Sequence, residues 1–198
     1  MYKKYKEFID QYISFNIIEW TLLKSKLKTL DYKKGEIIHY AGDICSTLMF
    51  INSGIARAYI IDDEGKDHTW AIYFNDKNAK ITNLYVVDYD SFIHKTESHI
   101  SIEILEDAEF ITVTYDDIQF LYNHKKKGER FGRLMSEAAY SYVHNYIIDR
   151  RTKSATQRFE EFMEKTPYLL DKVPQYHIAT LLGITPQSLS RLKKNKKY

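Results

Sequence analysis

Cysteine and long apolar runs are both scarce in this chain of 198 residues. A single thiol, Cys45, cannot form an intrachain disulfide and cannot supply the ligands, usually four, of an iron–sulfur cluster. No apolar run approaches the length of a transmembrane helix. The first residues, MYKKYKEFIDQYISF, are basic but lack the apolar core and the small-residue cleavage site of a signal peptide. We therefore expect a cytoplasmic protein with no membrane partner.

Patterns typical of enzymes and metal sites are also missing. The sequence has no P-loop, no GxSxG motif and no nucleophile–base pattern with recognisable spacing, which predicts a protein that is not an enzyme. His39, His68, His94 and His99 fall in a β-rich region, but no His-x-His pair occurs, as a metal-binding cupin would need. Nothing in the spacing of Cys45 or the histidines favours haem, and we expect Cys45 to be a small buried hydrophobe. We expect no metal and no cofactor.

Charge is distributed unevenly along the chain. The formal net charge is only +2, but residues 150–198 carry 11 Lys and Arg against 4 Asp and Glu. Residues 1–149 carry 18 Lys and Arg against 23 Asp and Glu. An acidic body with a basic end suggests a polyanionic partner for that end.

The first two thirds of the chain change from a helical to a β pattern. Residues 3–29 have apolar side chains at helical spacing, and the pattern changes at Asp31. From there, β-branched and aromatic runs alternate with regularly spaced glycines, which predicts a β sandwich or barrel with a hairpin turn at Gly65 in DDEGK. The segments YVVDYDSF and HISIEILEDAEFITVTY predict further strands, which end near Tyr115.

Two helices are predicted after the strands. TYDDIQFLY has the features of a short helix with Thr114 as its N-cap. A long helix is expected from Gly128 to about Arg151, and it carries a narrow stripe at steps of three or four residues: Phe131, Leu134, Ala138, Tyr142, Asn145 and Ile148. Such a stripe suits the coiled-coil seam of a dimer. The alternative is a helix that packs on its own domain.

The end of the chain, VPQYHIATLLGITPQSLSRLKK, predicts a helix, a tight turn and a second helix. The first helix covers Gln175 to Leu182, and Gly183 ends it because positive φ costs glycine little. Thr185 is a good N-cap for the second helix, and Pro186 suits its first position. This is the pattern of a helix–turn–helix, whose second helix enters the DNA major groove.

The side chains of the second helix suit contact with DNA. Arginine can bind guanine, glutamine adenine and serine either base, whereas lysine contacts phosphates. The candidate residues are Thr185, Gln187, Ser188 and Arg191 for bases, and Lys193, Lys194, Lys196 and Lys197 for phosphates. The alternative is a helical hairpin with a solvated basic end.

Nearly the whole chain resembles the Crp/Fnr family of bacterial transcription regulators. The resemblance rests on KKGEIIHYAGD, LMFINSGIARAY, the Gly65 turn, QRFEEFMEKTPYLL and the helix–turn–helix segment, which is particularly similar to regulators of Bacteroidetes-type bacteria. It implies an α+β fold: an N-terminal β-roll (a double-stranded β-helix or jelly roll) with flanking helices, a long dimerisation helix and a C-terminal helix–turn–helix domain. The domains are then residues 1–120, 121–152 and 153–198.

The family resemblance also implies a function. We expect a homodimer that binds double-stranded DNA at a palindromic site, with RNA polymerase as a further partner. A signal would act through the long helix and the hinge RRTKSAT. The chain stops soon after the second helix, so we expect a wing after residue 194 to be absent or rudimentary. The alternative hypothesis is a ligand-binding sensor whose C-terminal helices dock a protein instead of DNA.

The chain departs from the family at the effector pocket. Cyclic-nucleotide-binding relatives carry a Gly-Glu pair and, about ten residues later, an Arg followed by Ser or Thr. These positions fall near Val87 and Asp88, and near Ser98 and His99. We take Asp88, Ser98 and His99 as the effector-pocket residues. Because no cation stands there to compensate a cyclic phosphate, we expect weak or no binding of cyclic AMP and an effector that the sequence does not identify.

Overall fold

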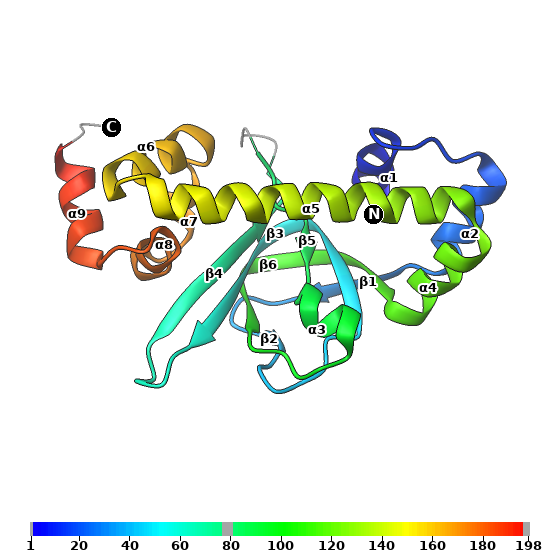
Figure 1. Cartoon of the computed structure of the whole chain (residues 1–198), viewed down its shortest axis with the longest axis horizontal. Helices are drawn as coiled ribbons and strands as arrows, with labels where there is room; N and C mark the ends of the chain where they lie inside the picture. Colours follow the sequence, from blue (N-terminus) through cyan, green and yellow to red (C-terminus); the bar gives the residue numbers. More distant parts are fainter. Residues whose placement is uncertain (1, 77–80, 196–198) are drawn as a thin grey trace.

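A long helix crosses a rolled antiparallel sheet in the computed structural model, which describes residues 2–76 and 81–195 (Figure 1). The helices are α1 (Lys3–Asp10), α2 (Ile17–Ser25), α3 (Tyr89–His94), α4 (Tyr115–His124), α5 (Lys126–Thr152), α6 (Ala155–Lys165), α7 (Leu169–Lys172), α8 (Gln175–Leu182) and α9 (Pro186–Asn195). The strands are β1 (Lys28–Tyr32), β2 (Ile37–His39), β3 (Thr47–Ile61), β4 (Asp67–Phe74), β5 (Tyr85–Val86) and β6 (Ser101–Thr114). In the described part of the chain, no helix is long and apolar enough to cross a membrane.

The two longest strands, β3 and β6, form the centre of the sheet. They pair antiparallel from Thr47 opposite Thr114 to Tyr59 opposite Ser101. β1 and β2 pair with β6, whereas β4 and β5 pair with β3. The β3–β6 register shifts repeatedly between Ile51 and Ala56, and such irregularities bend a strand pair and increase its twist. The sheet therefore closes into the β-roll that the family resemblance implies.

Aliphatic and aromatic side chains fill one apolar cluster in the β-roll. Ile51, Val86, Ile102, Ile104 and Phe110 each have no more than 1% of their surface exposed. Ile102 and Ile104 alternate with less buried residues along β6, which forms the strand predicted in HISIEILEDAEFITVTY.

Two predictions of local structure were wrong. The helical pattern expected up to residue 29 gives way to β1 at Lys28, because this segment pairs with the outer edge of β6. The segment YVVDYDSF forms only the two-residue strand β5, and helix α3 follows it. The Asp88 side chain caps this helix by accepting a hydrogen bond from the Ser91 amide. Capping by Asp88 therefore outweighs the strand propensity of the residues around it.

Other predicted boundaries are confirmed. Thr114 caps α4, and its hydroxyl accepts a hydrogen bond of 3.2 Å from the Asp117 amide. The hairpin between β3 and β4 is closed by hydrogen bonds between Asp62 and Lys66, with Gly65 at positive φ. Helix α5 covers the range predicted for the long helix and begins two residues earlier.

β3 and β6 approach each other closely at Gly54, and a substitution there can test this contact. Gly54 has a φ of +88°, and a Cβ there would lie 2.4 Å from the Asp107 carbonyl oxygen. Gly65 has a similar φ of +76°, but a Cβ there would meet nothing within 4 Å. We predict that Gly54→Ala lowers the free energy of unfolding by about 2–4 kcal/mol, through strain and overlap together. Gly65→Ala, the matched control, should cost only about 1–2 kcal/mol through backbone strain. Urea denaturation measures both, and equal losses would contradict the close approach.

Candidate nucleic-acid interface

Helices α8 and α9 form a helix–turn–helix. Gly183 ends α8 in the left-handed conformation, and the Ile184 amide donates back to the Ala179 carbonyl at 3.0 Å. The Thr185 hydroxyl accepts a hydrogen bond of 3.1 Å from the Ser188 amide and so caps the start of α9. Leu189, on the inner side of α9, is fully buried. The turn and cap that the sequence predicts are confirmed.

Two arginines from other helices hold the end of α8. The Arg150 guanidinium of α5 donates to the Leu181 carbonyl, and Arg158 Nε of α6 donates to the Leu182 carbonyl at 3.0 Å. Cations at a helix C-terminus satisfy its last carbonyls and interact favourably with the helix dipole. The orientation of α8, and of the turn that follows it, is thereby tied to α5 and α6.

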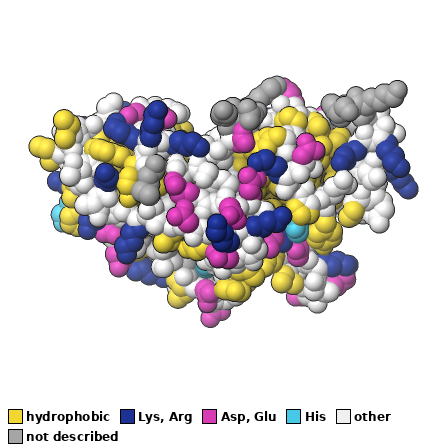
Figure 2. Space-filling view, turned by 180° about the vertical axis from the view of Figure 1, so that it is seen from behind, with side chains coloured by type: hydrophobic (Ala, Val, Ile, Leu, Met, Phe, Trp, Pro, Cys, Tyr) yellow, Lys and Arg dark blue, Asp and Glu magenta, His cyan; other side chains and the backbone are white. Residues whose placement is uncertain are grey.

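The outer face of α9 carries the predicted DNA-contacting side chains. Gln187, Arg191 and Lys194 are exposed, whereas Ser188 and Lys193 are half-buried. The Ser188 hydroxyl lies 3.0 Å from the Thr185 hydroxyl. In the space-filling view, Lys and Arg side chains lie at the end of the molecule that α9 occupies, and others are spread over the rest of this face (Figure 2). Lys196 and Lys197 lie outside the described residues.

The stripe predicted on α5 divides into two parts. Phe131 and Leu134 are half-buried, and the Phe131 ring packs edge-on against Phe8 and Tyr12 of the N-terminal segment. Ala138, Tyr142, Asn145 and Ile148 are exposed. A cavity of about 750 Å³ lies between this face of α5 and the N-terminal helices. The first part of the stripe therefore packs on its own chain, and the second part faces solvent.

The three predicted effector-pocket residues do not form an open site. Asp88 Oδ2 accepts a hydrogen bond of 2.7 Å from the Ser98 hydroxyl, and Ser98 is 3% exposed. His99 is exposed and is not part of this pair. The nearby Lys95 ammonium lies over the Tyr115 ring, 4.4 Å from its centroid. Protein groups thus bond to each other at the position that the family resemblance aligns with a phosphate-binding arginine.

The remaining candidates are the cysteine and the side chains that could bind a metal. Cys45 is buried, and burial raises the pKa of its thiol, which keeps it protonated. Among the described residues, no three His, Cys, Asp or Glu side chains come together as metal ligands would.

Solved structures with the same arrangement of elements come from several bacteria. FixK2 from Bradyrhizobium japonicum matches with a TM-score of 0.69 and 13% identity, over 85% of this chain and 83% of that chain. A putative transcriptional regulator of the Crp/Fnr family from Eubacterium rectale matches with a TM-score of 0.65 and 20% identity, over 93% and 87%. The chain has the Crp/Fnr fold.

A third Crp/Fnr-type structure, a CooA mutant from Carboxydothermus hydrogenoformans, matches with a TM-score of 0.62 and 19% identity, over 91% of this chain and 80% of that chain. No protein-family model matches the sequence, and no curated protein is significantly similar to it. What this chain shares with the solved structures is therefore the order and packing of a β-roll, a long helix and C-terminal helices.

One group of polar residues was missed by the sequence analysis. Arg57 of β3 and His177 of α8 lie in a buried cluster that joins the β-roll to the helix–turn–helix. A charged residue inside the apolar run GIARAYI was the available signal, because an arginine buried in a strand needs acidic partners.

The cap at Thr185 can be tested by its effect on stability. We predict that Thr185→Ala lowers the free energy of unfolding by about 1 kcal/mol, because the Ser188 amide loses its acceptor. Thr185→Ser keeps the hydroxyl and should stay close to the wild type. Thermal unfolding of the three proteins measures the difference, and equal effects of Ala and Ser would argue against the cap.

Proposed function

We propose that this protein is a homodimeric, sequence-specific DNA-binding transcription regulator that reads a palindromic operator with α9. The observation that carries the proposal is the capped helix–turn–helix, with Gln187 and Arg191 exposed on a basic outer face and the apolar side of α9 packed inward. Gln187 in the first turn of α9 and Arg191 one turn later lie where glutamine and arginine can reach base edges. In the described part of the chain neither Arg191 nor Lys194 makes an ion pair, so both are available to a polyanion.

The proposal assigns a role to each part of the chain. Residues 1–120 are the effector-type domain, residues 121–152 are the connecting and dimer helix, and residues 153–198 are the DNA-binding domain. Homodimer formation is supported by the exposed part of the α5 stripe, from Ala138 to Ile148, next to the exposed Val143 and Ile147. A two-fold axis along α5 would present two copies of α9 to successive major grooves. The similarity to regulators of Bacteroidetes-type bacteria and the role of RNA polymerase as a partner are predictions from the family resemblance.

In this proposal the pocket of the effector-type domain does not bind cyclic AMP. It is supported by the hydrogen bond between Ser98 and Asp88, and by the absence of an arginine at the position that would meet the phosphate. A cyclic phosphate brought there would lack a compensating cation. We therefore expect selective DNA binding without added cyclic nucleotide.

The alternative function is a ligand-binding sensor whose C-terminal helices dock a protein. Substitutions on α9 separate the two functions. Arg191→Ala should cost about 1–3 kcal/mol at one base position and relax selectivity there. Lys194→Ala, a phosphate contact, should weaken binding to all sequences alike and reduce the salt slope by about 1.

Fluorescence anisotropy on a randomised palindromic DNA library, across a salt series, measures both variants. The experiment is run without ligand and then with cyclic AMP. Unchanged selectivity of Arg191→Ala would argue for the protein-docking alternative. Selective binding that requires cyclic AMP would contradict the proposed pocket.

The dimer helix can be tested with a charge on its exposed stripe. We predict that Tyr142→Glu converts the dimer to a monomer, because an unpaired carboxylate would be buried at the seam. Tyr140→Glu is the matched control: Tyr140 is also exposed, but two residues along an α-helix place it on nearly the opposite face. Sedimentation velocity measures the mass of each protein. A monomeric wild type, or an equal effect of the two variants, would contradict the interface.

A further inference from the structure

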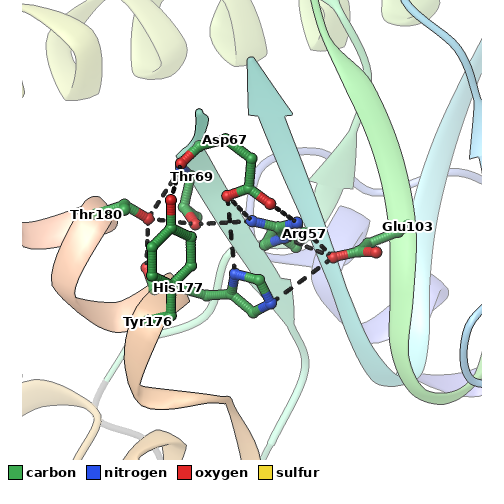
Figure 3. Close-up of polar contacts among 7 residues, drawn as sticks. All are labelled: Arg57, Asp67, Thr69, Glu103, Tyr176, His177 and Thr180. Atoms are coloured by element: carbon green, nitrogen blue, oxygen red, sulfur yellow. Dashed lines mark hydrogen bonds and ion pairs between the residues drawn. The ribbon is translucent and has the colours of Figure 1, made fainter. Parts of the chain in front are cut away.

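A buried ion-pair cluster lies where the β-roll meets the helix–turn–helix (Figure 3). Arg57 of β3 has only 2% of its side chain exposed. Its guanidinium donates to both carboxylate oxygens of Asp67 on β4, at 2.8 Å each, and its Nε donates to Glu103 on β6 at 2.6 Å. The hydrogen bonds from Arg57 lower the pKa of the Asp67 carboxyl, so this acid stays ionised. Bidentate arginine–carboxylate contacts of this kind fix geometry as well as charge.

Helix α8 places three side chains against this cluster. The Thr180 hydroxyl lies 2.9 Å from the Thr69 hydroxyl and accepts a hydrogen bond of 3.1 Å from the Thr69 amide. The Tyr176 hydroxyl donates to the Asp67 carbonyl at 3.0 Å. The His177 ring lies 3.9 Å from the Asp67 carboxylate and 4.0 Å from that of Glu103. One face of α8 is thus bonded to β4 across more than a hundred residues of sequence.

The imidazole of His177 completes the packing of this face. Burial and the positive charge of Arg57 lower the pKa of His177, although Asp67 and Glu103 act in the opposite direction. The ring is therefore neutral at pH 7. It fills the space between α8 and the two carboxylates without adding a second buried cation next to Arg57.

An apolar contact surrounds the polar one. Ile55, Ile72, Phe74 and Leu105 of the sheet share a single buried cluster with side chains of the C-terminal helices. The members from the C-terminal part of the chain are Phe159, Phe162, Leu169, Val173, Ile178, Ala179, Leu182 and Leu189. Apolar burial holds the two parts together but is not directional. The hydrogen bonds from Thr180 and Tyr176 to β4 are directional, so they select one orientation of α8 on β4.

That orientation determines where the recognition helix points. α9 follows α8 through the short Gly183 turn and packs by Leu189 on the shared cluster. Gln187 and Arg191 remain on the exposed side of α9 when α8 is docked. Docking therefore leaves the DNA-contacting face open and removes its freedom to rotate relative to the β-roll. A recognition surface that is already ordered loses less entropy on binding.

We propose that the cluster of Arg57, Asp67, Glu103, Thr69 and Thr180 is a latch that holds the helix–turn–helix on the β-roll in its DNA-binding orientation. The Thr69 hydroxyl accepts a hydrogen bond of 3.3 Å from Arg57, so the latch joins β4 to α8 directly and joins β3 and β6 to α8 through Arg57. Movement in the sheet therefore reaches α9 without passing through α5 and the RRTKSAT hinge. Rearrangement of the sheet by an effector would change DNA affinity by this short route. The proposal rests on the proposed function in its DNA-binding part, whereas docking of α8 is independent of it.

A disulfide across the latch tests both parts. In the double variant Thr69→Cys, Thr180→Cys, the sulfur atoms can take the positions of hydroxyls that lie 2.9 Å apart, close enough for a bond after small adjustment. The native Cys45 is buried and elsewhere in the fold, and the two single variants are the controls. We expect mild oxidation of the native protein to form the intrachain bond, detected by non-reducing electrophoresis and mass spectrometry. The oxidised protein should bind the selected operator within about three-fold of the wild type, since the latch is then closed permanently.

The outcomes separate the two proposals. Failure of the native double variant to form the bond would overturn the docked latch. Efficient formation of the bond, together with loss of selective DNA binding in the oxidised protein only, would overturn the DNA-binding orientation. A wild type that binds no operator selectively would instead contradict the proposed function, while the yield of cross-link still reports on docking.

A milder substitution tests the contribution of the hydrogen bonds alone. Thr180→Val keeps the shape of the side chain but removes its hydroxyl, so we expect about three- to ten-fold weaker operator binding with an unchanged circular dichroism spectrum. Thr156→Val, at an exposed position on α6, is the matched control and should bind as the wild type does. Operator affinity of Thr180→Val equal to that of the control would overturn the latch.

Discussion

The antiparallel pairing of β3 with β6 is the interaction on which the rest of the structure depends. Every other strand is bonded to one of these two, so the register between them sets the position of the whole sheet. The same register places Arg57 directly opposite Glu103. A shift by one residue would turn every side chain of one strand to the other face. The apolar core of the roll and the buried charged cluster beside α8 therefore follow from a single pairing.

The C-terminal helices depend on this sheet in turn. Their apolar side chains form one cluster with those of β3, β4 and β6, so the helix–turn–helix and the β-roll share a core. Short helices of eight to eleven residues are marginally stable by themselves, and most of their stability comes from packing of an apolar face. The DNA-binding end that we propose thus inherits both its stability and its orientation from the sheet, and Arg150 connects it to the long helix as well.

Local signals in the sequence were sufficient for the elements of the candidate site. Gly183, Thr185 and Pro186 mark the turn of the helix–turn–helix, and the structure has the two helices on either side as predicted. The hydrophobic periods of β6 and α5 were equally clear. The short helix α3 was missed because its capping residue, Asp88, stands within a segment of strong strand propensity. The assignment of bases and phosphates to particular α9 residues stays a prediction.

The sequence by itself determined the order of the elements, their periodic apolar faces and the turn chemistry between them, because these depend on neighbours a few residues apart. Only the tertiary structure decided which distant side chains meet. Arg57 and His177 are 120 residues apart, and nothing near either residue indicates the other. Long-range contacts of this kind follow from strand register and packing, which no local pattern encodes.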